Sequence, residues 1–264
     1  MFRGMLAISG IIHVFRGVDI ANTEFLGYSL PMSELCEVYR GEGFAAYYKP
    51  KGIPTAPLKF SRDGKSLLEQ VIARCPAVSS VRGYSDWEPG LLHRLDTATS
   101  GLVLIAFDND TFERLSSFQD RDLMTKTYTA RVLRKMPDAS FPPPDEELLG
   151  ALADGIPVRR FAVESAFRAW GVGRQAVRPC SPSSRKGSSR VYRTVICRGS
   201  EADTAVCTIT RGFRHQIRCH LAWIGFPIAG DGLYGGTGGP LGLECTKITF
   251  PGTEITLSPT LTDI

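Results

Sequence analysis

A short apolar segment near the middle of the chain limits the fold more than any other part of the sequence. Residues 102–107 read Leu-Val-Leu-Ile-Ala-Phe, an uninterrupted apolar run rich in branched side chains. Such a run is typical of a buried strand. The polar segment before it, residues 93–101, is therefore expected to be a loop held on a rigid sheet, where proteins commonly present reactive groups.

That polar segment contains a single carboxylate, Asp96, which lies between Arg94 and a turn of threonine, serine and glycine. Gly101 at the end of the turn permits backbone conformations that other residues resist. Chemistry alone leaves two interpretations open. Asp96 either caps a tight turn, which is a common role for aspartate, or is a reactive group that the loop presents.

Length and composition indicate a globular protein with an ordinary core. The chain has 264 residues, of which 43% are hydrophobic and 22% charged, enough for one large or two small domains. Its longest apolar runs are far below the roughly 20 residues of a membrane span, and residues 1–15 lack the features of a signal peptide. Seven scattered cysteines without a Cys-x-x-Cys pair indicate free thiols in a reducing cytoplasm, and we predict no metal site.

Charge is distributed unevenly along the chain. The formal net charge is +4, but residues 159–218 contain twelve arginines and one lysine against three acidic residues, a net charge of +10. The rest of the chain therefore carries −6. A basic block of this size on an otherwise acidic protein indicates either a polyanionic partner or an arginine-rich surface that only contacts solvent.

Periodicity predicts that strands and helices follow one another from residue 35 onward. We expect one domain over residues 35–264, preceded by an N-terminal extension of uncertain structure at 1–34. Ser66 and Glu69 have the spacing of a capping box at the start of a helix. The proline, serine and glycine residues of 176–189 predict a mobile basic loop. The predicted strands are 36–40, 44–48, 125–132, 190–198 and 205–211, and the predicted helices are 66–74, one that begins at 110, and 215–224, before a closing hairpin from 247.

Five short motifs give the most specific signal in the sequence. Residues 93–101 read His-Arg-Leu-Asp-Thr-Ala-Thr-Ser-Gly, residues 126–130 read Lys-Thr-Tyr-Thr-Ala, and residues 212–221 read Gly-Phe-Arg-His-Gln-Ile-Arg-Cys-His-Leu. Lys-Pro-Lys-Gly at 49–52 and Gly-Asp-Gly-Leu-Tyr-Gly at 230–235 complete the set. In residue type and order the motifs resemble those of the RluA-type pseudouridine synthase family, over nearly the whole of residues 36–264.

Two positions depart from the family pattern. Phe213 stands where the family usually has arginine, although Arg214 follows it directly. Leu243-Glu244-Cys245 stands where relatives usually show Leu-His-Ala. Both departures bear on local RNA contacts more than on the chemistry.

The resemblance implies a fold, a reaction and a partner. The implied α/β (α+β) fold is a mixed, largely antiparallel sheet flanked by helices, with a central basic cleft. The implied activity is isomerisation of uridine in ribosomal or transfer RNA to pseudouridine, which requires no cofactor or metal. We expect a cytoplasmic monomer that binds RNA and no membrane. About 35 residues precede the domain, too few for the accessory domain of many relatives, so substrate choice is expected to depend on the domain, its basic loop and the extension.

The resemblance also assigns roles to individual residues. It implies Asp96 as nucleophile or base, Tyr128 beneath the extruded uracil, and Arg218 as a cation that pairs with Asp96 and favours its charged form. His93, His215 and Gln216 are expected to form structural hydrogen bonds in the two loops. The predicted RNA contacts are Lys49, Arg94, Arg185, Lys186, Arg190, Arg214 and His215.

Two other functions are open from the sequence. A non-catalytic RNA-binding or ribosome-assembly protein on the same scaffold is favoured slightly by Phe213, but the presence of Asp96, Tyr128 and Arg218 argues against it. A carboxylate-dependent glycosidase would usually require two carboxylates placed on either side of the bond that breaks. The loop before the buried strand contains one carboxylate, Asp96.

Overall fold

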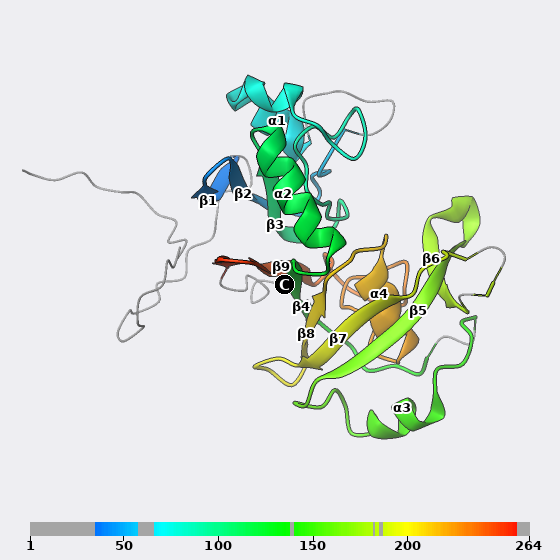
Figure 1. Ribbon diagram of the computed structural model, residues 1–264. Helices are drawn as coiled ribbons and strands as arrows, with labels where there is room; N and C mark the ends of the chain where they lie inside the picture. Colours follow the sequence, from blue (N-terminus) through cyan, green and yellow to red (C-terminus); the bar gives the residue numbers. More distant parts are fainter. Residues whose placement is uncertain (1–34, 58–65, 138–139, 182, 185–186, 258–264) are drawn as a thin grey trace, which may run out of the picture.

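The computed structural model describes most of the chain from residue 35 onward (Figure 1). The predicted extension at 1–34 lies outside the described residues, as do Arg185 and Lys186. The described ranges are 35–57, 66–137, 140–181, 183–184 and 187–257.

The apolar run at the centre of the sequence forms the buried strand β3, Ser100–Ala106, in which all seven residues are buried. It pairs antiparallel with β2 (Phe44–Lys49) and parallel with β9 (Leu243–Phe250). The buried strand predicted from 102–107 is therefore confirmed, with the polar loop directly before it.

Around β3 the chain builds a ten-stranded sheet. Apart from the parallel β3–β9 pair, its strand pairs are antiparallel, which confirms the predicted mixed, largely antiparallel sheet. The strand order is β1 (Cys36–Gly41), β2, β3, β9, β4 (Thr125–Arg131), β8 (Thr204–Ile209), β7 (Tyr192–Arg198), β5 (Phe161–Trp170) and β6 (Ala176–Cys180), with β10 (Thr253–Thr256) paired to β9.

Capping side chains mark the start of α1 and α2. The predicted capping box of Ser66 and Glu69 is present at α1, and the Asp108 side chain caps α2, so that α2 begins one residue earlier than predicted. In Figure 1, α1 and α2 lie over the β1–β3 end of the sheet, and α4 lies beside β5–β7. The helices are α1 (Leu67–Arg74), α2 (Asn109–Asp120), α3 (Glu146–Ala151), which the sequence did not predict, and α4 (Gln216–Trp223), with short 3-10 helices at Pro76–Ser80 and Val172–Arg174.

The predicted mobile loop over 176–189 is wrong at its start, because residues 176–180 form β6. Pro179 and the polar residues after it suggested a loop, but β6 lies at the end of the strand order, and among the described strands it pairs with β5 alone. An edge strand tolerates proline, because one side of its backbone has no hydrogen-bonding neighbour. β5, its partner, was not predicted.

A second, smaller hydrophobic cluster attaches the β5–β6 hairpin to α4. Phe213 is part of it: its ring stacks on that of Phe167 of β5, with centroids 5.0 Å apart and planes 10° apart. The Tyr192 ring lies 5.0 Å from Phe213. The departure from the family pattern at position 213 therefore supplies packing between α4 and β5.

None of the helices in the described ranges combines the length and the apolar composition that a membrane crossing needs.

Candidate functional site

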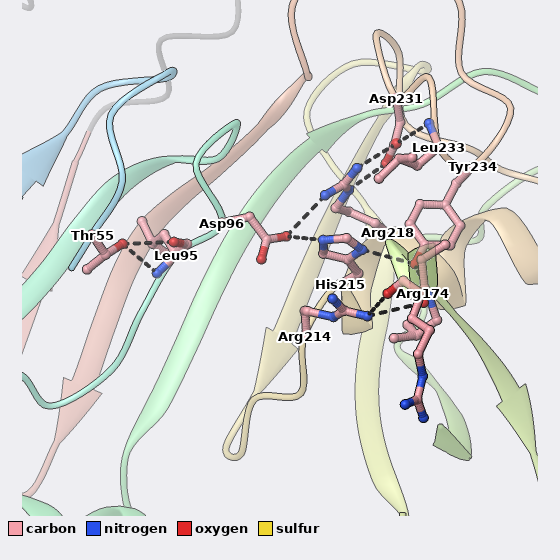
Figure 2. Close-up of polar contacts among 12 residues, drawn as sticks. Thr55, Leu95, Asp96, Arg174, Arg214, His215, Arg218, Asp231, Leu233 and Tyr234 are labelled. Carbon is pink, nitrogen blue, oxygen red and sulfur yellow. Dashed lines mark hydrogen bonds and ion pairs between the residues drawn. The ribbon is translucent and has the colours of Figure 1, made fainter. Parts of the chain in front are cut away.

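The loop that carries Asp96 is held in place by hydrogen bonds to its backbone. The Thr55 hydroxyl donates to the Leu95 carbonyl at 2.8 Å and accepts from the Leu95 N–H at 3.1 Å (Figure 2). The Thr99 N–H donates to the Asp96 carbonyl at 2.9 Å, which closes the turn. The Asp96 carboxylate itself is 27% exposed, so it is fixed by its loop and still open to solvent.

Gly101 allows this loop to enter the sheet. Its φ is +115°, and a Cβ atom there would lie 2.3 Å from the Cys245 carbonyl oxygen on β9. Only glycine fits both the backbone conformation and the close approach of the two strands. The glycine that ends the motif thus determines where β3 begins and where Asp96 is presented.

Lys49 lies beneath the same loop and is completely buried. Its ammonium group donates to the carbonyls of Pro50, Ile53 and Thr97 at 2.8, 2.7 and 3.2 Å. Burial lowers its pKa to about 7, although the Asp96 charge acts to raise that pKa. The predicted RNA contact of Lys49 is wrong, because its donors are used inside the protein to join the 49–53 turn to the Asp96 loop.

Arg218, in the first turn of α4, contacts two carboxylates. Its Nε and Nη2 donate to Asp231 Oδ2 and Oδ1 at 2.7 and 2.8 Å, and its Nη1 donates to Asp96 Oδ2 at 3.2 Å. The sequence predicted the contact with Asp96 but not the two bonds to Asp231. The only signal was that Asp231 is the carboxylate of the Gly-Asp-x-x-Tyr-Gly motif.

The ion pair with Asp231 is buried and keeps Arg218 charged. The side chains of Asp231 and Arg218 are 0% and 8% exposed. Burial acts to lower the pKa of Arg218, but the hydrogen bonds and charge of Asp231 outweigh it and raise the pKa above its ordinary value. Because a bidentate pair fixes the plane of the guanidinium, Nη1 is aimed at Asp96.

His215 approaches Asp96 from the residue that precedes α4. Its Nε2 lies 3.7 Å from Asp96 Oδ2, and its Nδ1 lies 3.1 Å from the Tyr234 hydroxyl. That hydroxyl accepts a hydrogen bond of 2.8 Å from the Val177 N–H of β6. The backbone of His215 has φ +57°, which turns its side chain into this position before the helix begins.

These contacts determine the protonation of His215. Burial lowers its pKa, although the Asp96 charge opposes this, so the ring is neutral at pH 7. Burial raises the pKa of Tyr234 well above its ordinary value, so its hydroxyl keeps its proton. Because the Val177 N–H already donates to that oxygen, the phenol proton is directed to His215 Nδ1. We therefore assign the ring proton of His215 to Nε2, which faces Asp96.

The two nitrogen donors approach one oxygen of Asp96. Arg218 Nη1 and His215 Nε2 both face Oδ2, and within the described ranges Oδ1 has no hydrogen-bond partner (Figure 2). The carboxylate is thus anchored through one oxygen.

Tyr128 lies on β4 between Cys207 of β8 and Cys245 of β9. It is buried, and burial raises its pKa well above the ordinary value, with further contributions from Cys245 and from the Asp96 charge. Its hydroxyl is therefore protonated at neutral pH.

Three further predicted site residues, Arg94, Arg190 and Arg214, are exposed. Arg94 is exposed and forms an ion pair of 2.7 Å with Glu88. Arg214 is exposed and donates to the Arg174 and Ala176 carbonyls at 2.8 and 3.2 Å, and Arg190 is exposed. Over the described ranges, no three His, Cys, Asp or Glu side chains come together as a metal site would require.

The chain matches the family model described as RNA pseudouridylate synthase over residues 43–223. It is 27% identical over 222 residues, 83% of its length, to the uncharacterized RNA pseudouridine synthase YlyB of Bacillus subtilis. It is 26% identical over 228 residues, 86% of its length, to ribosomal large subunit pseudouridine synthase D of Pseudomonas aeruginosa. The matches cover 63% and 61% of these relatives, so the chain spans about three fifths of their length.

Solved structures show the same fold at low sequence identity. Human RNA Pseudouridylate Synthase Domain Containing 1 superposes with a TM-score of 0.57 at 20% identity, covering 88% of this chain and 86% of that chain. Human RNA Pseudouridylate Synthase Domain Containing 4 gives 0.56 at 16% identity, covering 85% and 88%. Both likenesses support the fold alone.

The buried pair generates a stability prediction. Arg218→Met leaves the Asp231 carboxylate buried with one backbone donor, Leu233 N–H, and should lower the free energy of unfolding by about 3–5 kcal/mol. The double variant Arg218→Met/Asp231→Leu removes both charges and should recover much of that stability. Urea unfolding at pH 7 measures both. A single variant as stable as wild type would contradict the described pair.

Proposed function

Because the chain belongs to the RNA pseudouridylate synthase family, we propose that it isomerises specific uridines in RNA to pseudouridine. The observation that carries this proposal is the arrangement around Asp96. A charged arginine and a neutral histidine N–H face one oxygen of the carboxylate, and the second oxygen is open. The proposed catalytic domain is residues 35–264.

The reaction suits a single carboxylate. The bond between ribose C1′ and uracil N1 breaks, the base turns, and a bond forms between C1′ and C5. The proton on C5 is lost and N1 gains one, so atoms and electrons balance within the nucleoside. We assign Asp96 Oδ1 as the reacting oxygen, either as nucleophile or as base at the ribose, because Oδ2 is held by Arg218.

Tyr128 and Arg94 are proposed to handle the base. The Tyr128 ring can stack beneath the extruded uracil, and its protonated hydroxyl would lie near the reacting carbon. The target nucleotide must leave its stack, at a cost of a few kcal/mol. Arg94 precedes Asp96 by two residues and is exposed, which supports a role in entering the vacated position or contacting phosphates.

We favour ribosomal RNA as the substrate because of the name of one relative, and transfer RNA is the alternative. The Pseudomonas relative is named for the large ribosomal subunit. The proposed RNA contacts are the exposed residues Arg190 and Arg214, together with His215. Arg185 and Lys186, which lie outside the described residues, belong to the same proposal. A cytoplasmic location and a monomeric working unit belong to the same proposal.

Replacing the reacting carboxylate tests the reaction directly. Asp96→Asn keeps the side-chain shape but removes its charge, so pseudouridine formation should fall by at least ~10³-fold while RNA affinity changes little. Asp154→Asn, an exposed carboxylate after α3, is the matched control and should retain full activity. Release of tritium from RNA labelled at uridine C5 measures turnover. Substantial turnover by purified Asp96→Asn would refute the assignment.

The N–H of His215 that faces Asp96 is expected to orient the carboxylate, and substitution of His215 tests this. His215→Leu removes the N–H that faces Asp96 and should lower kcat roughly 10- to 100-fold with a small change in KM, because the nucleophile is less well oriented. His215→Gln keeps a donor near Nε2 and should retain most of kcat. Single-turnover rates compare the two variants. Equal rates for Leu, Gln and wild type would show that His215 does not position Asp96.

A further inference from the structure

The tip of the β5–β6 hairpin presents an exposed tryptophan beside two arginines. Arg178 Cζ lies 3.8 Å from the centroid of the Trp170 ring, and Arg168 Cζ lies 5.6 Å from it. Trp170 is 38% exposed. Because Arg168 pairs with Arg178 across the hairpin and Trp170 follows Arg168 by two residues, all three side chains are on one face.

This face has cations without matching carboxylates. Residues 165–200 contain eight arginines and lysines and no aspartate or glutamate. Within the described ranges, no carboxylate lies within 4 Å of Arg168, Arg174 or Arg178. Like charges placed opposite one another on a hairpin repel, and a polyanion would remove that repulsion.

The opposite face of the hairpin fixes it to the rest of the domain. Phe167 of β5 and Val177 of β6 are buried in the second hydrophobic cluster, which packs against α4. Their neighbours in sequence, Arg168 and Arg178, lie on the outward face, where both are half-buried and Arg178 Nη1 donates to the Ser140 carbonyl at 3.1 Å. Two exposed arginines also precede β5, at residues 159 and 160, at its other end.

The hairpin is connected to the site by hydrogen bonds. Arg214 donates to the Arg174 and Ala176 carbonyls in the turn, and the residue after Arg214 is His215, which faces Asp96 (Figure 2). The Val177 N–H donates to the Tyr234 hydroxyl, which contacts His215. An RNA strand whose target nucleotide lies at Asp96 thus has the hairpin turn as a close neighbour.

We propose that the outward face of the β5–β6 hairpin binds unpaired RNA next to the target nucleotide. Trp170 stacks on a base, and Arg168, Arg174 and Arg178 contact phosphates. Aromatic and arginine side chains on one surface are what unpaired RNA requires, since each base offers a stacking face and each nucleotide a charge. The inference rests on the proposed function, because it takes RNA as the substrate.

The test measures binding of a fluorescein-labelled oligouridylate by fluorescence anisotropy at several salt concentrations. Trp170→Ala should weaken binding about tenfold, and Trp170→Phe should retain most of the affinity. Arg168→Gln/Arg178→Gln should reduce the slope of log affinity against log salt by about 0.7 for each phosphate that the variant no longer neutralises. Arg159→Gln/Arg160→Gln removes the same charge at the other end of β5, about 30 Å away, and should change the slope less.

Thermal unfolding of each variant separates binding from folding. If the Trp170 variants and the double-arginine variant bind oligouridylate as tightly as wild type, the hairpin face is not an RNA-binding surface. The proposed function would be unaffected by that result. Lower unfolding temperatures with unchanged affinity would show that the arginines and tryptophan only stiffen the hairpin. Binding of polyglutamate in place of oligouridylate would indicate an acidic protein partner and also overturn the proposal. Failure of wild type to bind either oligouridylate or ribosomal RNA would overturn the proposed function as well.

Discussion

The buried ion pair between Arg218 and Asp231 is the interaction on which the site depends. A guanidinium at this depth is costly unless its donors are satisfied, and Asp231 satisfies two of them in a fixed plane. The third donor direction then points at Asp96. Orientation of the Asp96 carboxylate is therefore a consequence of packing between α4 and the loop that carries Asp231.

The second constraint is the attachment of the β5–β6 hairpin to α4. Phe213, Phe167 and Tyr192 pack the hairpin against the start of the helix, and Tyr234 joins its backbone to His215. Elements far apart in sequence therefore meet at Asp96. In this setting Phe213 supports the site by packing.

Much of the fold could be predicted from local pattern. The buried strand, the capping box of α1 and the contact between Asp96 and Arg218 followed from hydrophobic runs, cap spacing and motifs. The burial of Lys49 could not be predicted, because a lysine beside prolines and a glycine is typical of an exposed turn. Its burial depends on backbone carbonyls that the tertiary fold brings around its ammonium group. β6 contains a proline that only an edge position tolerates. Asp231 lies in a glycine-rich loop, and its partner Arg218 is thirteen residues earlier in the sequence. The fold brings the two side chains together, so the pair could not be predicted from local pattern.

The proposed function depends on pseudouridine formation through Asp96. The most direct measurement maps pseudouridine across all RNA of cells that carry the wild-type gene, a deletion, or an allele encoding Asp96→Asn expressed at the same level. At least one uridine should be modified with the wild-type gene, unmodified in the deletion and still unmodified with the Asp96→Asn allele. Identical pseudouridine maps in all three strains, or full restoration by the Asp96→Asn allele, would contradict the proposed function.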